Sequence, residues 1–172
     1  IQTTIHPWTQ QTKYTALDKG QLISTHAYAA ALNIPTDIAD RELETLHNKL
    51  DLSTRKRLNF KGISQGNTAY VILNYEQHQQ VFSALGEMKK SAEKVAHDLS
   101  KEVKAYLESE AVADEYLADQ LLLPLALGKG GEFTAKVISE HTKTQAEMIQ
   151  KFIDCDIQFI DIGNSFKVNV GV

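Results

Sequence analysis

The sequence predicts an α/β (α+β) fold: a mixed-sheet α/β sandwich with helices on one face, interrupted by a small inserted α/β domain. Two observations support this prediction. The C-terminal half reads as helix, helix, strand, helix, strand, strand, an order that favours helices packed on a mixed sheet. The first residues read as a strand that can pair with this half, so residues 18–90 are predicted to be an insertion with its own strands and helix.

The first predicted strand covers residues 1–9, where apolar and polar residues alternate until Pro7 ends the pattern. Residues 21–32 fit either a strand or a helix, because the first half of this stretch is strand-like while its alanines favour a helix. The sequence alone leaves both interpretations open.

A helix is expected over residues 33–50, capped by Thr36 or Asp37 and with leucines spaced at i, i+3 and i+7 along one face. Two strands are expected at 56–63 and 68–76, separated by the turn-prone sequence SQGN. These elements make up the predicted insertion.

Two helices are expected to open the C-terminal half. The first covers about 91–108, with Ser91 as its N-cap. The second covers about 111–127, where Pro124 is expected to kink the helix or make its last turn irregular, and Gly128 ends it.

A strand, a helix and a hairpin are expected to complete the chain. Residues 132–139 read as the strand and residues 144–152 as the helix. The strands at 156–162 and 165–172 flank Gly163-Asn164, a dipeptide that favours a tight hairpin turn.

His141 stands at the predicted junction between a strand and a helix. Thr144 and Glu147 fit a capping box, so the unpaired N–H groups and the positive end of the helix dipole are expected to face the loop that holds His141. Such a place suits a phosphate, and an imidazole beside it can act as acid, base or nucleophile toward phosphorus. The alternative is an ordinary surface histidine or a second cap.

Three polar or aromatic residues fall on one face of the preceding helix, because Tyr116, Asp119 and Gln120 are spaced at i, i+3 and i+4. A ring, a carboxylate and an amide on one face can stack on a base, form hydrogen bonds with it and hold a metal. The alternative is a solvated polar stripe.

The composition limits the classes of function. The 172 residues carry a formal net charge of −4, which argues against binding along an extended nucleic-acid groove but not against an enzyme that contacts a nucleic-acid end. The only tight basic cluster, TRKR at 54–57, is interpreted as a solvated strand end, with RNA contact as the alternative.

Other features of the composition bear on location. No apolar run is long enough to span a membrane, no secretory signal is seen, and Cys155 is the only cysteine, so a cytoplasmic location is expected. Because the chain starts at Ile1 rather than at Met, we interpret it as a fragment or a trimmed product.

Several segments together resemble one protein family. DEYLADQLLLPLAL (114–127), a glycine turn and EHTKTQ (140–145) follow in the order found in the C-terminal part of RNA 3′-terminal phosphate cyclases. The segment 86–109 is similar to the family's sequence ahead of that helix, and ADRELETLHNKL (39–50) is similar to the helix of its small inserted domain. The resemblance covers most of the chain.

The resemblance implies a domain organisation and a reaction. Residues 1–17 and 91–172 are expected to form the last core repeat of the cyclase fold, and residues 18–90 the small inserted domain. Such enzymes use ATP to convert an RNA 3′-phosphate into a 2′,3′-cyclic phosphate. A histidine attacks the α-phosphorus of ATP, pyrophosphate leaves, and AMP then passes to the RNA end, where the 2′-hydroxyl closes the ring and expels AMP.

The resemblance also assigns roles to residues of this chain. His141 is the expected nucleophile, Tyr116 is expected near the adenine, and Asp119 and Gln120 are expected to be polar contacts of the nucleotide. Phe82 is a further candidate for an adenine neighbour. ATP, a divalent cation (Mg or Mn) and RNA 3′-phosphate ends are the implied ligands. No residue is assigned as a metal ligand, and no membrane is involved.

The chain departs from the family pattern in two ways. Gln145 stands where the family usually has Asn, and the arginine, the metal-binding glutamate and the glycine-rich segment of the family's first half are not among these residues. Two alternatives therefore stay open: a non-catalytic cyclase-like protein in ribosome assembly, whose members are expected to lack the histidine, and an inactive fragment without half of the ATP site.

Overall fold

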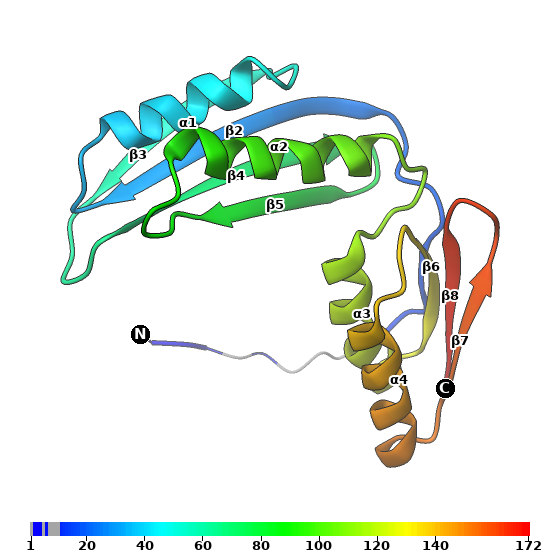
Figure 1. Ribbon diagram of the computed structural model, residues 1–172. Helices are drawn as coiled ribbons and strands as arrows, with labels where there is room; N and C mark the ends of the chain where they lie inside the picture. The colour runs from blue at the N-terminus through cyan, green and yellow to red at the C-terminus, as the bar shows by residue number, and fades with distance from the viewer. Residues whose placement is uncertain (1, 5, 7–10) are drawn as a thin grey trace. The chain divides into compact units, whose positions relative to one another are not determined.

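The structure is a computed structural model that describes residues 2–4, 6 and 11–172. The chain divides into two compact units, which we call the terminal unit (Ile1–Asp18 with Glu110–Val172) and the middle unit (Lys19–Ser109). Figure 1 shows their strands and helices along the chain. Most of the strand predicted at 1–9 falls outside the described residues, and residues 2–4 and 6 have no regular secondary structure.

The terminal unit contains a four-stranded mixed sheet, which confirms the predicted fold class. Its strands lie in the order β1 (Tyr14–Ala16), β6 (Gly131–Ala135), β8 (Phe166–Gly171) and β7 (Asp156–Asp161). β1 runs parallel to β6, whereas β6, β8 and β7 are antiparallel neighbours. The predicted hairpin is formed by β7 and β8.

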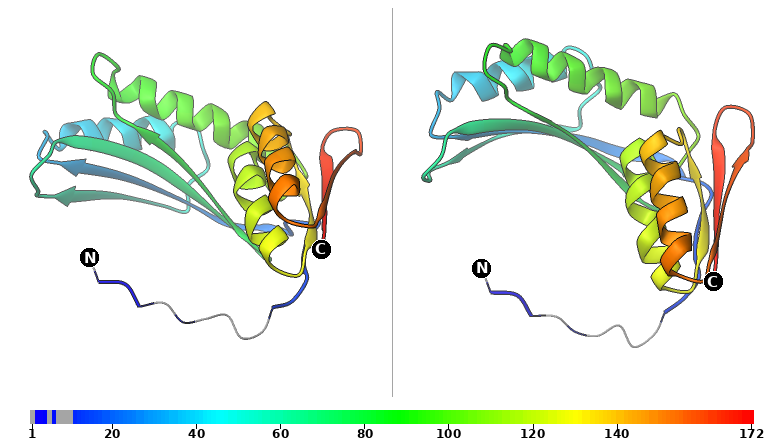
Figure 2. Two further views of the ribbon diagram at one scale, coloured as in Figure 1. Left: turned by 90° about the horizontal axis from the view of Figure 1, so that it is seen from below. Right: turned by 60° about the horizontal axis from the view of Figure 1, so that its bottom comes forward.

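Two helices cover one face of this sheet. α3 (Glu115–Leu127) packs against β6 and β8, α4 (Glu140–Phe152) packs against β7, and the helices contact each other. Figure 2 shows both helices on the same side of the strands. A shared apolar core holds the layers together, because buried side chains from both helices meet buried side chains of the sheet, among them Ala118, Leu122, Phe133, Ile149 and Val168.

Pro124 does not interrupt α3. The helix continues to Leu127, and only its end is irregular: the N–H groups of Gly128 and Gly130 both donate to the carbonyl of Leu125, each at 3.1 Å. This tightened end terminates α3 at the predicted glycine.

One edge of the sheet is built from two separate segments. β1 pairs with the first part of β6, and Ala113 pairs in parallel with Ala135 at the other end of β6. The hydroxyl of Thr134 lies between them: it donates to the carbonyl of Leu17 at 3.3 Å and accepts from the N–H of Val112 at 3.0 Å. Thr134 thus connects the two points where the chain leaves and re-enters the terminal unit.

The middle unit has a second four-stranded mixed sheet. Its strands lie in the order β3 (Thr54–Phe60), β2 (Leu22–Leu32), β4 (Gly66–Tyr75) and β5 (Gln79–Leu85). β2 and β3 are parallel, and the other neighbours are antiparallel. Residues 21–32, which the sequence left ambiguous, therefore contain a central strand, β2. β5 is an additional strand that was not predicted from the sequence. β3 and β4 do not pair with each other, because β2 lies between them.

α1 (Asp37–His47) and α2 (Ala92–Leu107) pack side by side on this second sheet. The core between them is made of small side chains from β2 and larger ones from the helices, among them Ala27, Ala29, Leu46, Leu99 and Val103. Residues 91–109 belong to the predicted core repeat, whereas in the structure α2 lies in the middle unit, where its apolar face is buried. The assignment of these units as a core repeat and an inserted domain stays a prediction.

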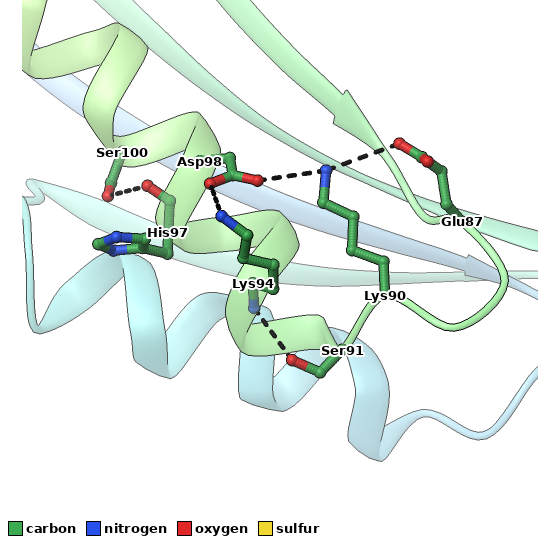
Figure 3. A network of polar contacts seen from close by, with 7 residues as sticks. All are labelled: Glu87, Lys90, Ser91, Lys94, His97, Asp98 and Ser100. Atoms are coloured by element: carbon green, nitrogen blue, oxygen red, sulfur yellow. Dashed lines mark hydrogen bonds and ion pairs between the residues drawn. The ribbon is translucent and has the colours of Figure 1, made fainter.

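Polar contacts fix the start of α2, as Figure 3 shows. Ser91 caps the helix as predicted, its hydroxyl accepting from the N–H of Lys94 at 3.2 Å. Asp98 accepts from Lys94 at 2.6 Å and pairs with Lys90 at 3.3 Å, which in turn lies 3.6 Å from Glu87. The hydrogen bond from Lys94, assisted by the other lysine, lowers the pKa of Asp98.

A buried lysine joins the two ends of the middle unit. Lys19 is 6% exposed, and its ammonium donates to the carbonyls of Tyr106 (3.3 Å) and Ser109. The same ammonium lies 4.6 Å from the ring centre of Tyr106, where the π-face attracts a cation. The charge is thus compensated by the C-terminal carbonyls of α2 and by an aromatic ring.

Among the described residues, each helix is either too short or too polar to traverse a lipid bilayer.

Candidate functional site

The residues predicted to carry the chemistry lie mainly on the two helices of the terminal unit. α3 begins at Asp114, whose carboxylate accepts from the N–H of Leu117 at 2.8 Å. Because the helix buries Ala118 and Leu122 against the sheet, its polar residues lie toward solvent or toward α4. Asp119 is half-buried.

α4 begins earlier than the sequence predicts. The capping box at Thr144 is not used. The helix starts at Glu140, and the hydroxyl of Ser139 accepts from the N–H of Thr142 at 3.2 Å. The hydroxyls of Ser139 and Thr142 also lie 3.0 Å apart, which secures this start. His141 is therefore not in a loop but in the first turn of α4.

This correction brings the imidazole closer to the positive end of the helix than predicted. His141 is exposed, and the first-turn N–H groups of a helix favour an anion beside them. The neighbouring Glu140 forms an exposed ion pair with Lys143 at 2.6 Å, so the lysine and carboxylate closest in sequence to His141 pair with each other.

His141 and Asp119 share one pocket. An open cavity of about 500 Å³ is lined by residues of α3 and α4: Asp119, Glu140, His141, Thr144, Gln145 and Met148. An imidazole and a carboxylate on different helices thus face the same space, next to the N-terminus of α4. This arrangement can present a nucleophile to a phosphate while a carboxylate binds a donor or a cation.

A side-chain amide fixes the carboxylate in this pocket. In the amide orientation that satisfies both partners, the Gln145 nitrogen donates to the Asp119 carboxylate at 2.5 Å and to the Asp119 main-chain carbonyl at 2.6 Å. The contact connects α3 to α4 at the cavity. Gln145 stands at the position where the sequence analysis noted a departure from the family, and the longer side chain reaches Asp119 here.

The structure does not bring all predicted site residues together. Tyr116 is 66% exposed and Gln120 is exposed on α3, and neither lines the cavity with His141. Phe82 lies in β5 of the middle unit, is only 5% exposed, and packs its ring 5.3 Å from that of Tyr106. Its burial in that core gives no accessible face for an adenine.

Comparison with known proteins identifies the family of this chain. Residues 6–159 match the sequence profile described as RNA 3′-terminal phosphate cyclase. The chain belongs to this family. It is 39% identical over 155 residues to an RNA 3′-terminal phosphate cyclase of Koribacter versatilis (strain Ellin345), a match that covers 88% of this chain and 44% of the relative.

Two further cyclases, from Salmonella enteritidis PT4 (strain P125109) and Salmonella gallinarum (strain 287/91 / NCTC 13346), are each 33% identical over 152 residues. These matches cover 88% of this chain and 45% of each relative. The chain thus spans less than half the length of these cyclases, and the family resemblance inferred from the sequence is confirmed.

Part of this pocket was not predicted from the sequence. Thr144, Gln145 and Met148 follow His141 at i+3, i+4 and i+7, the spacing of one helix face. That signal was present but was hidden by placing the helix start at Thr144. Recognising Ser139 as the N-cap would have revealed it.

The donors in the pocket suit a divalent cation only in part. No cluster of three His, Cys, Asp or Glu side chains that could hold a metal occurs among the described residues. Mg²⁺, however, is commonly bound by one or two carboxylates together with substrate phosphates and water. Asp119 and Glu140 supply such carboxylates at this cavity.

Proposed function

We propose that this chain supplies the adenylate-accepting histidine of an ATP-dependent RNA 3′-phosphate cyclase, a cytoplasmic nucleotidyl-transfer ligase. The observation that carries the proposal is the shared pocket of His141 and Asp119 at the N-terminus of α4, in a chain of the cyclase family. The names of the relatives support the reaction class.

The chemistry assigned to His141 is attack on phosphorus. A neutral ring nitrogen forms a bond to the α-phosphorus of ATP, and the bond to pyrophosphate breaks with its electrons going to the leaving group. The phosphoramidate then transfers AMP to an oxygen of the RNA 3′-phosphate, which frees the imidazole. Attack by the neighbouring 2′-hydroxyl forms the cyclic phosphate and expels AMP.

The other residues of the pocket act on charge and position. The N–H groups at the start of α4 favour negative charge on the phosphate oxygens, and Gln145 holds the Asp119 carboxylate toward the cavity. Asp119 and Glu140 are the groups that would hold Mg²⁺ or Mn²⁺. When bound, such a cation supplies positive charge against the departing pyrophosphate.

These 172 residues alone are proposed to be inactive in turnover. The residues that line the pocket include no Lys or Arg, although a bound triphosphate carries several negative charges that need compensation. Tyr116 and Gln120 lie on α3 outside this cavity. A nucleotide bound at His141 would therefore contact them only if it extended along α3. Groups outside these residues are expected to complete the ATP site.

Label transfer from ATP tests the role of His141. In the natural protein that carries this sequence, α-labelled ATP should label the polypeptide through an acid-labile, base-stable bond, and His141→Ala should abolish labelling because no ring nitrogen remains to accept AMP. His47→Ala, which changes an exposed histidine at the end of α1, should label normally. Labelling of His141→Ala at the parent's stoichiometry would refute the proposal.

A further inference from the structure

The sheet of the middle unit has one face that no helix of that unit covers. Alternate residues of β2 and β4, such as Ala27, Ala29 and Val71, are buried under α1 and α2. The residues between them belong to the other face, which we call the open face. Figure 1 shows both helices on a single side of this sheet.

Two tyrosines form the centre of the open face. Tyr28 of β2 and Tyr70 of β4 are register partners, and their rings stack with centroids 4.9 Å apart and an interplanar angle of 12°. Desolvation and the neighbouring Tyr28 raise the pKa of Tyr70. The same row continues to Lys56 in β3 and Ser83 in β5, which are both exposed.

A row of hydrogen-bonded polar side chains crosses all four strands beside these tyrosines. His26 lies 2.6 Å from the Thr54 hydroxyl and 2.9 Å from the Ser24 hydroxyl. Asn74 donates to Ser24 at 2.9 Å and accepts from Gln79 at 2.6 Å. The row contains amides, hydroxyls and an imidazole, which are the groups that read the edges of nucleic-acid bases.

The charge of this face is positive in sign. None of the four strands β2 to β5 contains Asp or Glu. Arg55 and Arg57 turn toward α1, where they pair with Glu44 and Asp40 at 2.7 and 2.6 Å. Lys56 lies on the open face, and no ion pair is recorded for it among the described residues.

The two units also differ in net charge. The middle unit holds 12 Lys and Arg against 11 Asp and Glu, and the terminal unit holds 6 against 11, which together make the chain's 18 and 22. The negative charge of the chain therefore belongs to the terminal unit. The middle unit does not repel a polyanion overall.

We propose that the open face binds single-stranded RNA, with bases stacked on Tyr28 and Tyr70 and the phosphate backbone near Lys56. Sheets with aromatic residues on their central strands bind single strands because every base has a face that can stack on a ring. Four strands span on the order of 15 Å, which accommodates roughly two or three nucleotides. The choice of RNA rather than DNA rests on the function proposed above.

A second copy of the chain is the competing occupant. Three exposed apolar side chains, Phe60, Val81 and Leu85, lie on the outer strands of the open face. In a protein interface the apolar residues are expected at the centre, with polar residues at the rim. On the open face the two phenols lie on the central strands β2 and β4, and these exposed apolar side chains lie on the outer strands β3 and β5. This favours RNA.

Binding to the 172-residue chain tests the proposal without ATP. A short fluorescein-labelled oligouridine with a 3′-hydroxyl end, which is not a cyclase substrate, should bind in a fluorescence-anisotropy titration. Tyr28→Ala and Tyr70→Ala should each weaken binding by about fivefold or more through lost stacking. Tyr70→Phe, which keeps the ring, should bind as the parent does, and Lys56→Glu should weaken binding without disturbing the core.

Matched controls separate this surface from the rest of the molecule. Phe152→Ala removes an 81% exposed ring from the end of α4, and Lys101→Glu reverses an exposed charge on α2; neither should change the affinity. A 4-thiouridine probe should crosslink to peptides that contain β2 or β4. His141→Ala should leave binding unchanged, so loss of labelling by ATP and loss of binding at this face are separate results.

Three results would overturn the proposal. One is the absence of binding to the parent chain, and another is unchanged affinity in Tyr28→Ala, Tyr70→Ala and Lys56→Glu. The third is a shift of the chain from dimer to monomer in Tyr70→Ala, seen by analytical ultracentrifugation, with RNA affinity unchanged. That result would assign the open face to self-association.

Discussion

Glu42 is a carboxyl group of α1 with no exposure to solvent. Its Oε1 accepts a hydrogen bond from the side chain of Asn67, whereas Oε2 has no hydrogen-bond partner among the described atoms. Burial raises its pKa from 4.5 to about 7, although the Asn67 bond and the charge of Arg41 act in the opposite direction. The folded middle unit therefore prefers the protonated form.

This preference predicts a stability that falls as pH rises. Below the unfolded-state pKa both states are protonated and the contribution is fully present. Between that pKa and about 7 the folded state binds more protons, so the free energy of unfolding decreases, by on the order of 3 kcal/mol in total. Glu42→Gln keeps an acceptor for Asn67 and carries no charge, and should remove this loss.

Urea unfolding of parent and variant at pH about 4 and about 8 measures the effect, because other titrating groups cancel in the difference. The variant should match the parent at the lower pH and exceed its stability at the higher pH. Glu110→Gln, at an exposed carboxylate of the terminal unit, should change neither value. An unchanged pH dependence in Glu42→Gln would show that Glu42 ionises freely in the folded state.

At the scale of elements, two N-cap candidates compete at the start of α4. Thr144 with Glu147 fits the better local pattern, yet the helix begins after Ser139. The reason is tertiary: starting there lets Thr142, Ala146 and Ile149, spaced at i, i+4 and i+7, all become buried. Packing of this face thus outweighs the capping box.

The two caps give opposite expectations for stability. Ser139→Ala removes the acceptor for the Thr142 N–H and should cost about 1 kcal/mol in the free energy of unfolding. Thr144→Ala is the matched control: it changes an exposed residue inside the helix and should be neutral or slightly stabilising, because Ala favours helix interiors. Denaturant unfolding of both variants measures these changes. A larger loss of unfolding free energy in Thr144→Ala than in Ser139→Ala would show that α4 begins at Thr144, as the sequence predicted.

Element prediction succeeded where a pattern was local and failed where packing decided. The Gly163-Asn164 hairpin and the Ser91 cap follow from short-range chemistry and were predicted. The alanines of β2 left this segment ambiguous between strand and helix, and the structure shows why they are there: Ala27 and Ala29 are small where β2 packs beneath the leucines of α1. The helix propensity of alanine carries no information about this need for small side chains in a packed strand.

For the candidate site, too, the sequence predicted individual residues but not the contacts that depend on tertiary packing. The family pattern located His141 and Asp119, and the structure brings them to one cavity. The contact between Gln145 and Asp119 depends on how α3 packs against α4, so no sequence spacing between the helices predicts it. Phe82 as an adenine neighbour rests on the resemblance alone and stays a prediction, and its ring is buried in the core of the middle unit.

At the scale of the whole molecule, the chain leaves the terminal unit near Leu17 and returns to it near Val112. In each unit, the hydrogen bonds of one side chain connect the segments where the chain enters and leaves. Thr134 connects these two points within the terminal unit, and Lys19 connects the ends of the middle unit. The predicted insertion ends at residue 90, because the resemblance groups the following helix with the C-terminal segment. The boundary between the two units falls after Ser109, so α2 lies in the middle unit. That the middle unit is the inserted domain stays a prediction.

These contacts predict that the terminal unit can be loosened alone. Thr134→Val keeps the shape of the side chain but removes both hydrogen bonds, each contributing about 1 kcal/mol, and both bonds lie in the terminal unit. Hydrogen exchange followed by mass spectrometry should therefore be faster in peptides that cover 11–17, 110–113 and 131–135, and unchanged in peptides from β2 and β4.

Thr68→Val is the reciprocal control, because the Thr68 hydroxyl donates to the Ala84 carbonyl at 3.2 Å within the middle unit. Its effect should be confined to peptides of β4 and β5. Equal acceleration in both units by either variant would contradict the expectation, since it would mean that the two units open as one cooperative structure. Separate effects would show that each unit is stabilised by its own core, with the Thr134 contact acting only where the chain leaves and re-enters the terminal unit.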